Sequence, residues 1–129
     1  MRTLLATGAL LVLASAIPGR ARAEDGCANP KTTYDKTYCV AKLFLESDKE
    51  LNQVYKDLKK AIPKPVQVKL TDVQKEWISY RDTTCESNGT INVQCNFDVN
   101  KTRTEYLRDR LRECKTGHCQ EEQIGKKSW

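Results

Sequence analysis

Six cysteines, more than any other feature, restrict what this chain can fold into. They are spread along the chain as Cys27, Cys39, Cys85, Cys95, Cys114 and Cys119. An even number of cysteines in a small exported chain is typical of disulfides rather than of reduced thiols or zinc ligands. A domain of this size buries only a modest core, so bridges at about 2–4 kcal/mol each would supply a large share of the net stability.

The first 23 residues indicate that the chain is exported. They combine a basic start, a short apolar run and an Ala-Arg-Ala ending, which is the pattern of a cleaved secretory signal. The apolar run is too short to span a bilayer comfortably, and no lipid-attachment pattern precedes Cys27. We therefore expect residues 1–23 to be removed and residues 24–129 to form a single domain in the bacterial periplasm or outside the cell, without membrane insertion.

Loss of that segment also lowers the net charge. Three of the 22 Lys and Arg residues fall within it, so 19 remain against 17 Asp and Glu, which gives +2 in place of +5. A surplus this small, on interleaved basic and acidic residues, gives little of the electric field that nucleic-acid or anionic-membrane binding requires. We expect neither nucleic acid nor membrane as a partner.

Apolar spacing predicts two long helices in the first two thirds of the exported region. The first is expected to be capped near Asn29 and Pro30, to stop at Pro63, and to turn inward a stripe of Val40, Leu43, Phe44, Leu51, Val54, Tyr55 and Leu58. The second is expected to open at Pro65, and its apolar residues advance by four, three, four and three through Val66, Leu70, Val73, Trp77 and Tyr80. This spacing places Trp77 and Tyr80 on a buried face.

A third helix is expected from about Asp98 to Cys114, after a turn at Asn88-Gly89. Its inward positions would be Thr104, Leu107, Leu111 and Cys114, with Arg103, Arg108, Arg110 and Arg112 on the other sides. No segment reads as a convincing strand, and the polar tail after Gly117 is expected to fray. The fold class is therefore all-α, a small disulfide-bonded bundle of about three helices built on a long helical hairpin.

Spacing alone leaves the disulfide connectivity open, since six cysteines allow 15 pairings. Cys85 with Cys95, and Cys114 with Cys119, flank turn-forming glycines and can close locally, which would leave Cys27 with Cys39. A helix rises about 1.5 Å per residue, so the last pair requires Cys27 to fold back or the helix to begin later. The alternative joins Cys39 to the second helix or to the loop after it.

Polar residues also follow helical spacing on facing sides of the first two helices. Asp48, Asn52 and Tyr55 lie on one side of the first, and Gln74, Arg81 and Cys85 follow a similar line on the second. We expect a mixed seam in which Arg81 reaches Asp48 or Asn52. The alternative is that Arg81 and Asp82 form a solvated pair of little energetic weight.

No combination of residues supports catalysis or a cofactor. The single histidine, His118, lies in a short cysteine-flanked segment and is a poor catalytic base, and no Gly-rich phosphate loop, zinc-protease motif or haem motif occurs. Cys114, His118 and Cys119 have the residue types of a zinc site, but in an oxidising compartment the two thiols would close on each other. We therefore expect no catalytic residues, no metal and no cofactor.

Three motifs resemble the bacterial LprI-type family, whose founding member is described as a lysozyme inhibitor. They are Asp48-x-x-Leu51-Asn52-x-x-Tyr55, then Gln74-x-x-Trp77-x-x-Tyr80-Arg81-Asp82-x-x-Cys85, and Cys95 with Arg103-x-x-x-Leu107. The resemblance implies a helical, disulfide-bonded, exported protein that binds another protein, lysozyme in the founding case. The founding type is a lipoprotein, whereas this chain lacks a lipid-attachment signal, and Asn100 stands where the family usually has Thr.

The motif residues are typical of a framework, so a partner-binding surface has to be sought elsewhere. Lysozymes act through a carboxylate pair in a cleft, which a basic or hydroxyl-bearing finger could enter. The candidate finger is the Cys114–Cys119 loop, with Lys115, Thr116 and His118 supported by Arg108 and Arg112. The alternative function is an envelope or virulence-associated interaction module without lysozyme contact, and the oligomeric state stays open.

Overall fold

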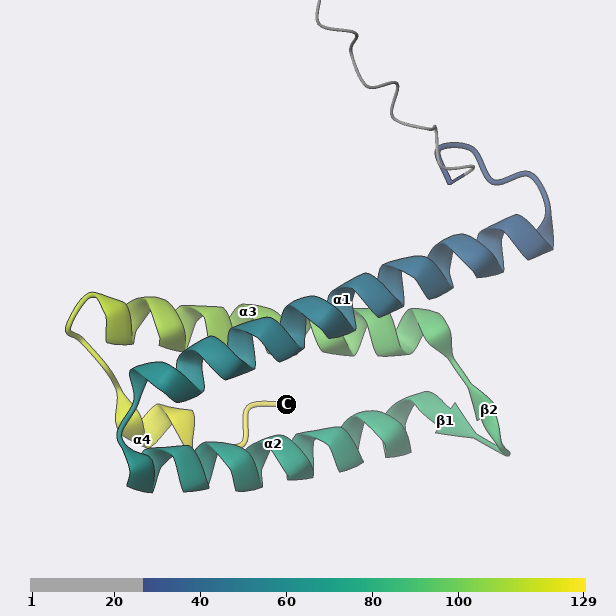
Figure 1. Cartoon of the computed structure of the whole chain (residues 1–129). Helices are drawn as coiled ribbons and strands as arrows, with labels where there is room; N and C mark the ends of the chain where they lie inside the picture. The colour runs from purple at the N-terminus through teal and green to yellow at the C-terminus, as the bar shows by residue number, and fades with distance from the viewer. Residues whose placement is uncertain (1–26) are drawn as a thin grey trace, which may run out of the picture.

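The computed structural model of the protein describes residues 27–129, and the expected signal segment lies outside this range. In chain order the elements are α1 (Thr33–Ala61), α2 (Lys64–Cys85), β1 (Glu86–Ser87), β2 (Thr90–Ile91), α3 (Val93–Lys115) and α4 (Glu121–Ile124) (Figure 1). The expected all-helical, disulfide-bonded bundle is confirmed.

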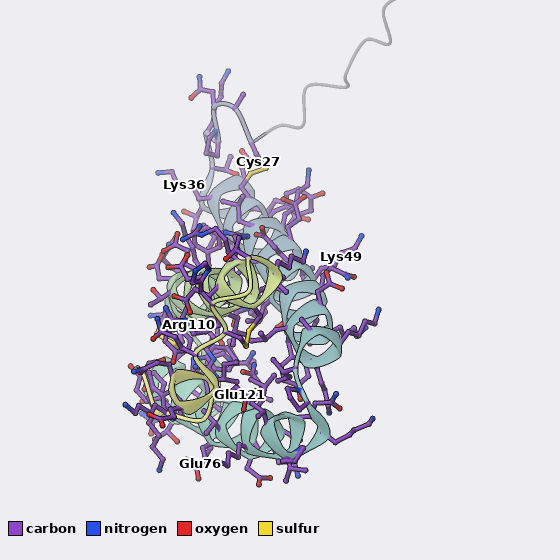
Figure 2. The ribbon with its side chains drawn as sticks, turned by 90° about the vertical axis from the view of Figure 1, so that its left-hand side faces the viewer. Cys27, Lys36, Lys49, Glu76, Arg110 and Glu121 are labelled. Carbon is purple, nitrogen blue, oxygen red and sulfur yellow. A yellow bond between two sulfur atoms is a disulfide. The ribbon has the colours of Figure 1, made fainter. Side chains whose placement is uncertain are left out.

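Helices α1 and α3 form the most closely packed pair of the bundle, and α2, which follows α1 after a short turn, packs against α3. Figure 1 shows α1 and α2 joined by a tight turn, with α3 returning beside α1 and the short α4 lying on α2. The end-on view of Figure 2 shows charged side chains such as Lys49 and Glu76 pointing outward from the helices. Between the helices lies one apolar cluster, made of Leu51, Leu58, Ile62, Val66, Leu70, Trp77, Leu107, Leu111 and Ile124.

Helix α1 begins later than the sequence predicted. Its cap is Thr32, not Asn29, because Thr32 and Asp35 form a reciprocal capping box: the Thr32 hydroxyl accepts from the Asp35 backbone N–H (3.0 Å), and the Asp35 carboxylate accepts from the Thr32 N–H (2.9 Å). The hydrogen bond from the Thr32 backbone N–H lowers the pKa of the Asp35 carboxyl group most, followed by the interactions with the Thr32 hydroxyl and the Lys31 backbone N–H. The late start leaves Cys27 room to fold back to Cys39.

We expect Thr32→Ala to lower the free energy of unfolding by about 1 kcal/mol, because the substitution leaves an amide at the start of α1 without its partner. Urea denaturation followed by circular dichroism measures the change. Lys36→Ala, an exposed position in the same turn, is the matched control and should change stability far less. Equal midpoints for Thr32→Ala and wild type would contradict the role of the box.

The inward stripes are confirmed for α2 and partly wrong for α1. Trp77 is 1% exposed and Leu70 is fully buried, while Tyr80 is half-buried against the core cluster. On α1, Leu51 and Leu58 are buried as expected, but Leu43 is 47% exposed. Leu43 lies in the N-terminal half of α1, which in Figure 1 diverges from α2 and therefore has less of the bundle to pack against.

Helix α3 begins earlier than predicted, and a small β-ladder precedes it. The Asn92 side chain accepts from the Cys95 N–H (3.0 Å), so the helix starts at Val93 rather than near Asp98. Glu86 pairs with Ile91, and Ser87 with Thr90, in an antiparallel register. The expected turn joins them, with φ of 51° at Asn88 and 73° at Gly89, as a two-residue hairpin requires. The expectation of no strand is wrong for this ladder.

The C-terminal tail is ordered, which corrects the expectation that it frays. Ile124 in α4 is fully buried in the core cluster, and the Tyr106 hydroxyl donates to the Gln123 carbonyl. One apolar residue in a polar tail is a weak sequence signal, yet burying it ties the whole segment down.

Three disulfides tie the elements together. Cys27 pairs with Cys39, Cys85 with Cys95, and Cys114 with Cys119. These are the local pairings, and no bridge joins Cys39 to the second helix or to the loop after it. The middle bridge links the end of α2 to the first turn of α3, across the β-ladder.

Candidate functional site

The motif residues on α1 and α2 form the expected mixed seam, and α3 takes part in it. Arg81 Nη1 lies 3.4 Å from Asp48 Oδ1, while Arg81 Nε and Nη2 also donate to Asp82 Oδ1 at 3.0 and 2.9 Å. Arg81 therefore contacts both Asp48 and Asp82, and its largely buried side chain does not fit the alternative of a solvated pair. Asn52 does not reach Arg81; it is exposed and donates to Asp48 on its own helix.

Asn100 on α3 completes this seam. It is fully buried; its Nδ2 lies 3.4 Å from Ser47 Oγ and from Asp48 Oδ1, and its Oδ1 accepts from Arg81 Nη1 at 3.5 Å. A buried amide is retained at low cost only where it finds such partners. The seam therefore fixes how the three long helices register against each other, which is a framework role.

Arg103 was expected on an outer side of its helix and is instead buried, with 2% of its surface exposed. Its Nε donates to Oε1 of the buried Gln74 (3.1 Å), and its Nη1 donates to Ser128 Oγ (3.3 Å). Its Nη2 is buried without a hydrogen-bond partner, and among the described residues no carboxylate forms an ion pair with it. Burial lowers the pKa of Arg103 to about 10, so the group remains a cation at neutral pH.

Aromatic rings surround this guanidinium. Its central carbon lies 5.9 Å from the Trp77 ring centroid, 5.3 Å from that of Tyr106 and 5.4 Å from that of Trp129. Such contacts are within the range of cation–π attraction, which offsets part of the cost of burying the charge. The C-terminal Ser128-Trp129 segment thus folds back onto the motif residues of α2 and α3.

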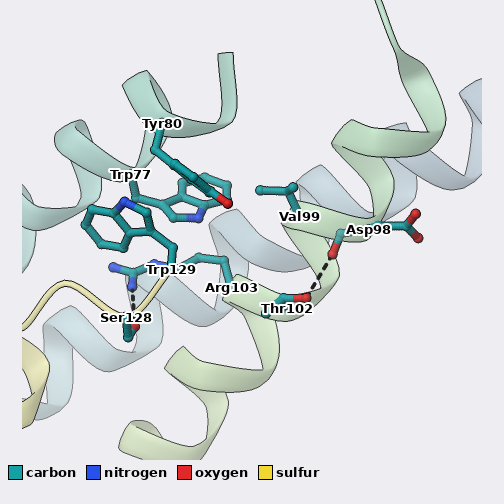
Figure 3. Close-up of a pocket in the computed structure, with 8 residues that line it drawn as sticks. All are labelled: Trp77, Tyr80, Asp98, Val99, Thr102, Arg103, Ser128 and Trp129. Atoms are coloured by element: carbon teal, nitrogen blue, oxygen red, sulfur yellow. Dashed lines mark hydrogen bonds between the residues drawn. The ribbon is translucent and has the colours of Figure 1, made fainter. Parts of the chain in front are cut away.

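A cavity of about 310 Å³ opens beside this cluster, between α2, α3 and the C-terminal segment. We call it the Arg103 cavity. Figure 3 shows its lining, which consists of Trp77, Tyr80, Asp98, Val99, Thr102, Arg103, Ser128 and Trp129. This cavity combines motif residues of α2 and α3 with an unpaired buried donor.

The sequence did not lead us to expect that Arg103 is buried, and it gave no reason to single out Trp129. The signal for Arg103 was present: Asn96, Asn100, Arg103, Leu107 and Leu111 follow the four-and-three spacing of one helix face. Arg103 was nevertheless assigned to the surface, because arginine side chains are rarely buried. For Trp129 no periodic signal exists, because the residue lies outside any helix.

The structure places the predicted finger at one end of the bundle. The connection between α3 and α4 forms the outermost point of that end in Figure 1. Gly117 takes φ of 80°, a left-handed conformation that suits glycine, and the Cys114–Cys119 bridge closes the loop. Lys115 and His118 are exposed in it. The Thr116 hydroxyl instead donates back to the carbonyls of Arg112 and Glu113, so it caps α3.

Arg108 and Arg112 are exposed on the side of α3 that leads to this loop, but both are already paired. Arg108 binds Glu50 of α1, and Arg112 binds Asp109 at 2.9 Å. Lys115 follows Arg112 by three residues on the same side and has no ion pair within the described range. The available positive charge of the loop is therefore that of Lys115, with His118 beside it.

Within residues 27–129, no group of three or more His, Cys, Asp or Glu residues could hold a metal ion. None of the helices in the same range is long and apolar enough to cross a bilayer.

These features define a small helical protein, bonded by three disulfides, whose motif residues form the polar seam and part of the core. The chain belongs to the LprI family: a family model described as "Lysozyme inhibitor LprI" matches residues 25–107, which is more than half of the chain. Neither the curated proteins nor the solved structures yield a significant match. The match includes the seam and Arg103, and it ends before the Cys114–Cys119 loop, α4 and Trp129.

Proposed function

We propose that this protein is an exported, non-catalytic binding protein that inhibits lysozyme. The observation that carries the proposal is the match to the lysozyme-inhibitor family over residues 25–107, the segment that contains the polar seam and the buried Trp77. Three disulfides suit a protein that works outside the cytoplasm, in the periplasm or beyond the cell.

We further propose that the Cys114–Cys119 loop enters the lysozyme cleft. The loop is held by a disulfide and by the Thr116 cap, so little ordering entropy is lost when it binds. Lys115 and His118 project from it as hydrogen-bond donors, which suits the carboxylate pair of a glycosidase cleft. Thr116 supports the loop rather than contacting the partner.

Turbidity of a peptidoglycan-bearing cell suspension measures inhibition directly. We expect residues 24–129 to slow lysis by an animal-type lysozyme, and a Lys115→Ala/His118→Ala variant to need about tenfold more protein for the same effect, as loss of an interface hot spot does. Lys101→Ala, an exposed lysine elsewhere on α3, is the matched control and should inhibit like wild type.

This assay tests lysozyme inhibition and the contact through the Cys114–Cys119 loop separately. Undiminished lysis at large molar excess of wild type would refute lysozyme inhibition. Inhibition that is unchanged in the loop variant would refute the loop as the contact and direct attention to residues 25–107.

A second candidate function, docking to another envelope protein, is favoured by an exposed apolar stripe. Tyr34, Tyr38 and Leu45 are 78%, 56% and 66% exposed and lie on one side of α1, away from the core. Large exposed apolar groups that gather on one face often mark protein contacts. If this function holds, an envelope partner will be retained by wild type and lost from Tyr38→Ser/Leu45→Ser, while lysozyme passes through.

A further inference from the structure

We propose that the Arg103 cavity binds a small aromatic carboxylate. The site is separate from the lysozyme-contacting loop, and neither the match to the inhibitor family nor the framework role of the motifs assigns a ligand to it. Three features carry the proposal: an unpaired buried guanidinium nitrogen, aromatic walls, and a cavity of restricted size.

The guanidinium defines the charge of the ligand. Arg103 Nε is used by Gln74, but Nη2 has no partner and Nη1 has only the 3.3 Å bond to Ser128 Oγ. A buried donor without an acceptor costs free energy, and a buried cation without a counter-charge costs more. The two Nη nitrogens form a planar fork that matches the two oxygens of a carboxylate, so one carboxylate would satisfy both needs.

The aromatic residues that line the cavity indicate that the ligand contains an aromatic ring. Trp77 and Tyr80 line the cavity from α2, and the Trp129 ring lies 6.0 Å from the Tyr80 ring, tilted by 37°. Aromatic rings pack best against another ring in offset or tilted arrangements of this kind. A volume of about 310 Å³ is at the low end for ligand pockets, so the site suits a ligand with a single ring.

One acidic residue lines the cavity, and it does not oppose a carboxylate at Arg103. Figure 3 shows the Asp98 carboxylate pointing away from Trp77 and Arg103. Asp98 Oδ1 accepts from Gln94 Nε2 at 3.0 Å, which holds it on the outer side. It would repel a second negative charge near the mouth, so a monocarboxylate fits better than a dicarboxylate.

Trp129 is the movable wall of the site. The ring lies over the guanidinium, 5.4 Å from its central carbon, yet 38% of the residue is exposed. Beyond α4 this segment is tied by the Ser128 bond to Arg103 and by an exposed ion pair of Lys127 with Glu76 (2.8 Å). On binding, the Trp129 indole would move off the guanidinium, so that the ligand ring fills the cavity against Tyr80 and the ligand carboxylate reaches Nη2.

Binding of benzoate and phenylacetate to residues 24–129 tests the proposal, with NMR shifts of the Trp77 indole N–H and the Arg103 Nε–H as the local readout and calorimetry for affinity. We expect a dissociation constant of about 1 mM or tighter, which a ligand of about nine non-hydrogen atoms can supply. Acetate lacks the ring and benzyl alcohol lacks the charge, so each should bind at least about tenfold more weakly.

Variants tie the binding to this cavity. Arg103→Gln should weaken benzoate binding at least about tenfold, whereas Arg110→Gln should not. Arg110 is the matched control because it lies on the same helix, stacks on Tyr106 at 5.3 Å and pairs with Glu113 outside the cavity. Thr102→Trp changes an exposed lining residue and fills the mouth; it should abolish binding even if Arg103→Gln does not fold.

Trp129→Ala tests the movable wall. Binding should tighten, because the open state no longer has to be populated at the expense of the Trp129 contacts. Weaker binding would overturn the role of Trp129 as a cover. Absence of shifts at about 10 mM benzoate, equal affinity for acetate, or unchanged binding to Thr102→Trp would each overturn the site itself.

Discussion

Replacing Trp77 with alanine is expected to lower the free energy of unfolding by about 3–5 kcal/mol, the range for deleting a large buried side chain. Trp77 is 1% exposed and packs in the core cluster between α2 and α3. Its ring also faces two arginines, with centroid distances of 5.5 Å to Arg81 and 5.9 Å to Arg103. The substitution therefore removes apolar burial, the ring that faces Arg81 and one of the three rings around Arg103. Urea denaturation followed by circular dichroism measures the loss.

The neighbouring Ile78 supplies the control. It lies on the same turn of α2 and is 40% exposed, so Ile78→Ala deletes apolar atoms from the same helix with little loss of burial. We expect a change below about 1 kcal/mol. Similar losses for Trp77→Ala and Ile78→Ala would mean that Trp77 does not serve as the core residue its burial indicates, and the aromatic motif of α2 would then have to be reconsidered as a contact surface.

The helices could be predicted because apolar spacing reports which side of a helix avoids water. The four-and-three spacing from Val66 to Tyr80 was sufficient to place Trp77 in the core. The ends were harder to predict, because a helix start depends on one side chain meeting one backbone amide. Asn29 and Thr32 are both good caps by type, and only the reciprocal bond with Asp35 decides between them.

The burial of a polar residue could be predicted only where the sequence placed a hydrogen-bond partner on the facing helix. Arg81 was expected to meet Asp48 or Asn52, because these residues follow facing lines on the two helices, and Arg81 Nη1 does lie 3.4 Å from Asp48 Oδ1. Arg103 was placed outward, because its burial depends on Gln74, the surrounding rings and a tail residue 25 positions away. Those contacts come from tertiary folding, which spacing within one helix does not encode.

The Cys114–Cys119 loop could be predicted from the sequence only in part. Its closure by Cys114 and Cys119 could be read from their short spacing and from the glycine between them. The engagement of Thr116 with α3, and of Arg108 with Glu50 on α1, could not be read. Long charged side chains have many possible partners, and the choice is made by the helix packing. Of the five candidate binding residues, we therefore propose Lys115 and His118 as the contacts.

Removing the Cys85–Cys95 bridge is expected to cost about 3 kcal/mol, the chain-entropy value for a loop of about ten residues. The two residues connect the end of α2 to the first turn of α3, and Cys85 is 3% exposed. The corner is also held by the two residue pairs of the β-ladder and by one bond from the Asn92 N–H to the Cys85 carbonyl, but an isolated ladder of this size is marginal in water. Chemical denaturation of Cys85→Ala/Cys95→Ala measures the loss.

The Cys114–Cys119 bridge is the matched control, because it spans a separation of 5 residues and should contribute about 2 kcal/mol. The two double variants should also differ in their effect on tryptophan fluorescence. Loosening the corner between α2 and α3 lets Arg103 shift against Trp77, so tryptophan fluorescence should change in Cys85→Ala/Cys95→Ala and stay near wild type in Cys114→Ala/Cys119→Ala. A reversed order of stability, or a larger fluorescence change in the loop variant, would show that the corner is held by helix packing alone and that the register of α3 does not depend on the bridge.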